Sequence, residues 1–429
     1  MAPAFSKKIP LAALAALMLA ACLSFWLAPA PQGAPEVEYW GHYARVGPGL
    51  GFVVNHDSYG YLAVAQAPGK LLLPQEVRQS RPLYALLGTA VGYPLTALLG
   101  LAGRAGLTPP WPAEEVAFYG FYSGFVLLNG LVLLLALWLL RQLFDVFTAG
   151  QGSRSELYAL TWVLVANPIT KAFFWTAHQQ MFAFLVPLFC LTLAIRLRLR
   201  PTLSWVGLGG LALGLGVLPL VYGSFVLAWP ALAFGILRIG SDQEPGITAG
   251  WPAKLGKTAF SAALFGLPTL AWIILLELVG TTYYNHEAER FHQLVWLLEA
   301  RHLPLSEALG LVGGKLLEYL ASIQLMGLWL LAGAGLYAAT RWRIRAQPAA
   351  ALLPPIAGPA LAWVAASFVL FFALLGYYPE RLAFTLLPLV LCLLAALSPR
   401  WPRRYAGPAA LAVAAGWHLY VLLSYGPFS

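Results

Sequence analysis

The sequence predicts an all-α protein that crosses a membrane many times. Of its 429 residues, 60% are hydrophobic and only 10% are charged, whereas soluble proteins carry about 25% charged residues. The mean hydropathy is +0.72, and apolar runs of about twenty residues, the length of a membrane-spanning helix, recur along the chain. Because a bilayer offers the backbone no hydrogen bonds, these runs are expected to be helices. Residues 1–429 are therefore expected to form one transmembrane domain.

The basic charge balance has a membrane explanation. The formal net charge is +9, and in membrane proteins excess Lys and Arg gather in short cytoplasmic loops, so no nucleic-acid partner is implied. Cys22, Cys190 and Cys392 all lie within apolar runs, and neither a disulfide framework nor a cysteine metal site is expected.

The first apolar run, residues 11–27, follows the basic pair Lys7 and Lys8. This pattern fits either a cleaved signal peptide or a retained span with a cytoplasmic N-terminus, and we favour the retained span. The residues before Cys22 also resemble a lipoprotein cleavage box, a short match that Ala/Leu-rich spans meet easily by chance.

Residues 30–115 are predicted to form a large extracytoplasmic loop, because they are rich in Pro and Gly and carry charges of both signs. Within them, residues 83–103 are long enough to span but contain Pro94 and several glycines. Counting them as a span would place the basic segment 196–200 outside, against the positive-inside rule. We interpret them as an interfacial or re-entrant helix, preceded by a short interfacial helix near residues 62–68.

About eleven spans then remain, with the N-terminus inside and the C-terminus outside. They are expected near residues 9–27, 116–140, 157–168, 181–195, 203–220, 222–237, 258–279, 316–339, 356–375, 382–397 and 407–423. A second extracytoplasmic loop is expected at residues 280–315.

One predicted span is interrupted by Asn167 and Pro168, after which the chain is expected to re-enter as a helix from Ile169. Broken helices at membrane depth are tolerated only where protein or a water-filled cavity satisfies the freed backbone. The sequence therefore predicts a cavity near residues 167–180.

The cluster that contains His56, Asp57, Arg78 and Arg81 is the main candidate for chemistry, because charge at a membrane face indicates function by default. Asp57 is expected at the N-terminus of the short interfacial helix, where the helix dipole favours an ionised carboxylate. An ionised Asp can act as a general base. The alternative is a helix cap with no further role.

Two motifs in this region carry a resemblance. The run His-Asp-Ser-x-x-Tyr-Leu at residues 56–62, followed by Arg-x-x-Arg-x-Leu-Tyr at residues 78–84, resembles the first outer loop of bacterial integral membrane glycosyltransferases of the GT-C superfamily. The aromatic turn after the Asn-Pro break and the Arg-x-x-Phe-x-x-Leu-Pro run at residues 381–388 are similar to later family segments. His178-Gln179-Gln180 stands where the family has an acidic triplet.

The resemblance implies a mannosyltransferase-like or aminoarabinose-transferase-like enzyme in the bacterial inner membrane, with an extracytoplasmic active site. Its donor is a sugar on polyprenyl phosphate, its acceptor a lipid, glycan or protein, and Asp57 is its base, with no cofactor. Arginines suit the lipid phosphate because the guanidinium fork matches its oxygens, although arginines at span ends more often snorkel. The expected substrate-binding residues are His56, Tyr61, Arg78, Arg81, Lys171, His178, Glu287, Arg290 and Arg381.

His286, Glu289 and His292 follow one another at spacings of three, which raises the question of a divalent metal site. Successive steps of three drift round a helix, and we expect no metal there. A surface helix that shapes the acceptor cleft is the preferred interpretation.

Two other functions fit parts of the pattern. Broken helices and a few outer charges also suit a transporter of a lipid-linked or polar substrate, and an O-antigen polymerase or ligase would use similar donors.

Overall fold

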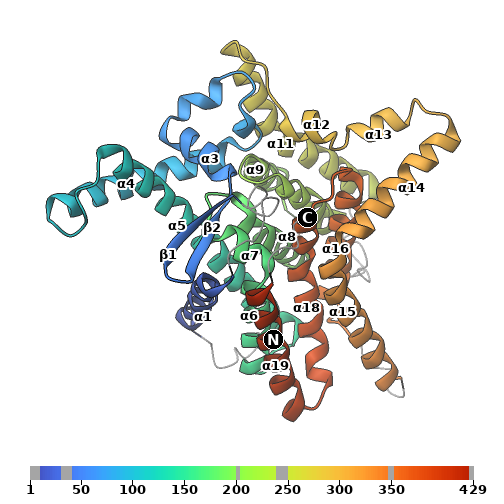
Figure 1. The fold of residues 1–429 in the computed structure, drawn as a ribbon. Coiled ribbons are helices and arrows are strands. Elements are labelled where there is room, and N and C mark those ends of the chain that lie inside the picture. The colour runs from blue at the N-terminus through green and yellow to red at the C-terminus, as the bar shows by residue number, and fades with distance from the viewer. Residues whose placement is uncertain (1–9, 30–40, 200–202, 238–249, 346–351, 425–429) are drawn as a thin grey trace.

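The computed structural model describes residues 10–29, 41–199, 203–237, 250–345 and 352–424. The described chain is a bundle of helices with one small pair of strands (Figure 1). Lys7, Lys8, Arg200 and the first part of the predicted outer loop, residues 30–40, lie outside the described residues.

The α-helices in chain order are α1 (Leu11–Ser24), α3 (Asp57–Gln66), α4 (Pro82–Arg104), α5 (Ala113–Phe147), α6 (Arg154–Val165), α7 (Pro168–Phe173), α8 (Phe182–Leu199), α9 (Trp205–Val217), α10 (Ala228–Leu237), α11 (Trp251–Leu278), α12 (His286–Phe291), α13 (Val295–Ala300), α14 (Leu305–Ser322), α15 (Gln324–Arg343), α16 (Ala357–Leu375), α17 (Glu380–Ala383), α18 (Leu387–Leu397) and α19 (Arg403–Leu423). The strands are β1 (His42–Gly47) and β2 (Leu50–Val54).

Within the described residues, seven helical segments are long and apolar enough to cross a membrane, or eight if the bent pair α14 and α15 is counted as one span. The seven contain α4, α5, α8, α11, α16, α18 and α19. The helices α1, α9 and α10 are apolar but shorter. The all-α, multi-helix class is thus confirmed, whereas the predicted count of about eleven spans is not.

The predicted span 316–339 is wrong as a single helix. The chain bends by 80° between α14 and α15. The bend frees backbone amides at the start of α15, and Glu380 Oε1 accepts a hydrogen bond from Leu325 N at 3.0 Å. A carboxylate from a distant segment therefore stabilises a break that hydropathy does not reveal.

The helix α4 covers the segment predicted as an interfacial or re-entrant helix; it is unbroken over 23 residues and passes the length and composition test for a span. It packs closely against α5. A Cβ on Gly88 would lie 2.1 Å from the Phe125 ring, and a Cβ on Gly124 would lie 3.2 Å from the backbone of Gly92. Small residues at such spacings let two helices approach closely. The glycines that weakened the span prediction instead form this helix contact.

The strands β1 and β2 were not predicted. They form an antiparallel hairpin in which His42 pairs with Val54, and Gly49 takes a left-handed φ of 69° in the turn, which glycine adopts without strain. The hairpin ends directly before α3. Thr176 Oγ1 donates to Val53 O at 3.3 Å, so the hairpin also fixes the start of α3 against the broken helix.

The predicted break after α6 is confirmed. Asn167 caps α7, and its Oδ1 accepts from Ile169 N and Thr170 N at 2.9 and 3.0 Å. The buried Asn129 of α5 satisfies the turn that follows. Its Nδ2 donates to the carbonyls of Phe173, Phe174 and Thr176 at 3.2, 3.0 and 2.7 Å. The freed backbone groups thus have protein partners, as irregular backbone inside a bundle requires.

The helix α1 is packed into the bundle. Leu14 and Cys22 are fully buried, and Cys22 O accepts from Trp175 Nε1 at 3.1 Å. Ser24 Oγ lies 2.8 Å from His418 Nε2 of α19. The helix α1 is thus fixed both to the turn after α7 and to α19.

Candidate functional site

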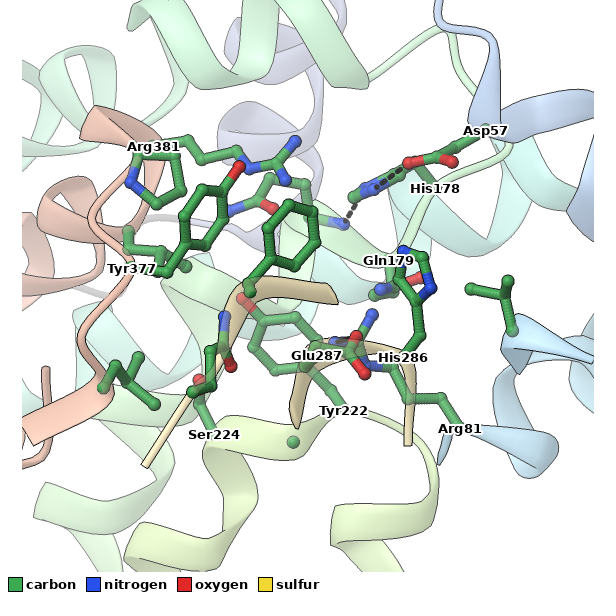
Figure 2. A pocket seen from close by; sticks show the side chains of 18 of the residues that line it. Asp57, Arg81, His178, Gln179, Tyr222, Ser224, His286, Glu287, Tyr377 and Arg381 are labelled. Carbon is green, nitrogen blue, oxygen red and sulfur yellow. Dashed lines mark hydrogen bonds and ion pairs between the residues drawn. The ribbon is translucent and has the colours of Figure 1, made fainter. Parts of the chain in front are cut away.

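A cavity of about 400 Å³ brings together most of the residues singled out in the sequence (Figure 2). Those that line it are Asp57, Tyr61, Arg78, Arg81, His178, Glu287, Arg290 and Arg381. They come from α3, from the turns before α4 and α8, and from α12 and α17. The cavity predicted near residues 167–180 is lined by the last three of them, and it joins segments more than three hundred positions apart.

Asp57 is the first residue of α3, as predicted. Its backbone N donates to Asn55 Oδ1 at 2.9 Å, a local bond that fixes the start of the helix. The helix dipole favours negative charge at this position. The Asp57 side chain is 52% exposed, and this exposure leaves the carboxylate accessible from the cavity.

His178 faces Asp57 across the cavity wall, with 3.6 Å between His178 Nε2 and Asp57 Oδ2. His178 Nδ1 accepts from Gln180 N at 3.2 Å, so the neutral ring carries its proton on Nε2, toward Asp57. Burial lowers the pKa of His178 and keeps the ring neutral near pH 7. His178, Arg78 and Arg381 together hold the pKa of Asp57 well below its usual range. Asp57 is therefore ionised at neutral pH.

The Arg78 side chain packs against the first turns of α3, beside Asp57. Its Nη2 lies 3.4 Å from Asp57 Oδ1 and 3.3 Å from Asp57 O, and its guanidinium stacks on the Tyr61 ring at 5.0 Å. A Cβ on Gly60 would lie 2.2 Å from Nη2. Gly60 therefore makes room for the arginine beside the carboxylate, a role that the sequence did not indicate.

We expect Gly60→Ala to displace Arg78 without harming the fold. Alanine is favoured over glycine inside a helix, and the clashing atom is the end of a flexible side chain. Losing the Arg78 cation raises the pKa of Asp57, so the acid limb of the activity profile moves to higher pH. The measurement is a pH–rate profile beside Gly69→Ala, whose added methyl has open space. Identical profiles for the two variants would contradict this role.

Arg81 and Glu287 form an ion pair that joins the first outer segment to α12. Burial by itself would lower the pKa of Arg81, but the Glu287 carboxylate and the Tyr61 hydroxyl outweigh it and raise the pKa. Arg81 stays charged beside the cavity. The main role of the Glu287 carboxylate is therefore to pair with Arg81. Contact with a ligand is its secondary role.

Gln79 also joins the first outer segment to the segment before α12, and its side chain is fully buried. Its Nε2 donates to Leu71 O and Leu73 O at 3.0 and 2.8 Å, and its Oε1 accepts from Tyr284 N at 2.9 Å. Trp272 Nε1 donates to Gln79 O at 2.9 Å. The cavity wall that carries Arg81 and Glu287 is thus stabilised by hydrogen bonds between side chains and backbone as well as by the ion pair.

Arg381 and Arg290 supply the remaining cations. The Arg381 guanidinium lies 5.8 Å from the centre of the Phe173 ring, and Figure 2 shows it with Tyr377 on the side of the cavity away from Arg81. Tyr377 stacks on Phe291 at 4.2 Å. In the described part of the chain, neither Arg290 nor Arg381 forms an ion pair with a carboxylate, so both charges are available to an anionic ligand.

The structure corrects the placement of His56 and Lys171, neither of which lines this cavity. His56 is exposed at the start of α3. Lys171 Nζ donates to Val421 O at 2.8 Å and to Ser424 O, at the end of α19, and burial lowers its pKa to about 8. Lysine often binds the last carbonyls of a helix, and here that contact holds α7 to α19.

Several lining residues were not predicted: Gln179, Gln180, Tyr222, Ser224, Phe291 and Tyr377. Gln179 and Gln180 are 2% and 3% exposed. Tyr222 lies at the interruption between α9 and α10. Its only signal in the sequence is the neighbouring Pro219 and Gly223, which mark a break between apolar runs.

The spacing of His286, Glu289 and His292 does not continue along one helix. The helix α12 ends at Phe291, and His292 caps it with a left-handed φ of 51°. Among the described residues, no three His, Cys, Asp or Glu side chains are grouped so as to hold a metal ion.

Comparisons with known protein families, with curated proteins and with solved structures found no match. The fold and the site therefore define the class by themselves. It is a helical protein with several candidate membrane spans, whose charged cavity sets the carboxylates of Asp57 and Glu287 among arginines.

Proposed function

We propose that the protein is a membrane glycosyltransferase that moves a sugar from a polyprenyl-phosphate donor to an acceptor hydroxyl. The observation that carries the proposal is the cavity in which the ionised Asp57 lies beside His178, with arginines on several walls. A base and a cationic site for phosphate are the two functions that such a transfer needs.

In the proposed reaction the acceptor oxygen attacks the anomeric carbon of the donor sugar. Its proton passes to Asp57 as the new C–O bond forms. The neutral His178 directs its Nε2–H at the carboxylate and orients it. One base and one displacement invert the configuration at the anomeric carbon.

The bond between the anomeric carbon and the phosphate oxygen breaks in the same step, and its electron pair stays with the polyprenyl phosphate. This leaving group gains negative charge, which Arg381 and Arg290 are suited to stabilise. Guanidinium groups bind phosphate oxygens through paired, charge-assisted hydrogen bonds. Because the phosphate is already a good leaving group, no strong general acid is required.

The proposed site lies at the extracytoplasmic face of a bacterial inner membrane. The segment Glu380–Arg400 begins at the cavity and ends at a basic loop. At 1.5 Å per residue its length is about 30 Å, the thickness of the hydrocarbon core. Basic loops favour the cytoplasm, which supports placing the cavity on the opposite side.

The test is transfer of labelled sugar by the purified protein in nanodiscs, with a panel of polyprenyl-phosphate sugars and lipid, glycan and protein acceptors. We expect one donor class to release polyprenyl phosphate in equal amount to the transferred sugar. No transfer with any donor, together with movement of a donor across vesicles that contain the protein, would reject the enzyme in favour of a transporter.

A further inference from the structure

A second cavity, of about 560 Å³, lies between α6, α15, α18 and α19. Its walls are almost entirely apolar and include Leu160, Val163, Leu336, Leu394 and Val413. None of the residues that line the first cavity lines this one. We call it the apolar groove.

The apolar groove has the length of one membrane leaflet. Along α19 it runs from Pro402 to Val413, a rise of about 16 Å at 1.5 Å per residue. Half of a typical hydrocarbon core is about 15 Å. An extended chain that enters at one membrane surface therefore reaches the bilayer centre within the groove.

One end of the groove is basic and aromatic. Trp401 and Tyr405 line it there. The Arg343 guanidinium lies 5.4 Å from the Trp401 ring, and that of Arg404 lies 4.6 Å from the Tyr405 ring. The one carboxylate in the lining, Glu156, accepts from Ser153 N at 2.8 Å in the capping box of α6. Positive charge thus faces the position of a lipid headgroup.

We propose that the apolar groove binds one acyl chain of an anionic phospholipid, with the headgroup at Arg343 and Arg404. The charge of the arginines selects an anionic headgroup over a zwitterionic one, and amphipathic aromatic side chains favour this depth of the membrane. The bound chain fills the space between α15 and α19 and holds them against α6. The site is independent of the proposed glycosyltransferase activity.

The first experiment blocks the groove. Ala409 lines it and is exposed, so Ala409→Phe fills it without disturbing a packed contact. Ala415→Phe on the same helix is the control, because Ala415 is exposed and outside the lining. Each variant is purified from nanodiscs of phosphatidylglycerol, and the lipid that it retains is measured by native mass spectrometry. We expect Ala409→Phe to retain at least about fivefold less lipid than the wild type, and the control to retain as much as the wild type. Equal retention by both variants would overturn the site.

The second experiment tests the headgroup. In mixed nanodiscs of phosphatidylglycerol and phosphatidylethanolamine, the wild type should retain the anionic lipid preferentially. The double variant Arg343→Gln, Arg404→Gln should retain both lipids equally. A preference that survives in the double variant would refute the assigned headgroup position. A dimer that forms in the wild type and dissociates in Ala409→Phe would show instead that a second copy of the chain covers the groove.

Discussion

Asp57→Asn is expected to lower kcat for sugar transfer by about 10³-fold while the donor KM changes little, because general-base catalysis contributes about 10²- to 10⁴-fold. Asparagine keeps the shape of the side chain but accepts no proton at neutral pH. In the wild type the pKa of Asp57 lies well below its usual range, so the base is ionised over the whole neutral range and its protonation limits the rate only in strong acid. The measurement is steady-state transfer from pH 5 to 8.

The control is Glu299→Gln in the second loop. The Glu299 side chain resembles that of Asp57 in two respects: it is 55% exposed, against 52% for Asp57, and it contacts a histidine. Unlike Asp57, Glu299 does not line the cavity. It should leave the rate unchanged. A turnover in Asp57→Asn close to that of the wild type would remove Asp57 from the chemistry, and the search for a base would move to His178 and Glu287.

Arg381→Lys is expected to lower kcat/KM for the polyprenyl-phosphate donor by about 10²-fold. Lysine keeps the positive charge but loses the planar fork that binds two phosphate oxygens, and a hydrogen bond to a charged group contributes about 1.5 to 3 kcal/mol. Arg381 has no ion-pair partner among the described residues, so its replacement leaves no buried carboxylate behind. The measurement pairs transfer kinetics with binding of polyprenyl phosphate alone.

The matched variant is Arg301→Lys, an exposed arginine whose Nε donates to the neighbouring His302 at 3.0 Å outside the cavity. It should match the wild type in both measurements. If Arg381→Lys binds polyprenyl phosphate as tightly as the wild type does, the phosphate does not lie at Arg381. Arg290 and Arg81 would then be the positions to examine.

Prediction from the sequence was most accurate where a residue acts on its immediate neighbours in the chain. The break after α6 follows from Asn167 and Pro168, whose capping and missing amide act within one turn. The position of Asp57 at the start of α3 follows from the same local logic. The bend between α14 and α15 was missed because its stabilising carboxylate, Glu380, is 55 positions from its partner Leu325.

Composition and hydropathy predict a helical chain that is apolar along its length, and its few polar residues supply a carboxylate, a histidine and several arginines as candidates for a site. Which of these residues meet follows only from the folded arrangement of the helices. In the folded chain Glu287 contacts Arg81, 206 positions away, and Lys171 binds the end of α19. Hydropathy and helix signals report each segment's own environment, whereas a pair of side chains meets only through the packing of distant helices, which no local pattern encodes.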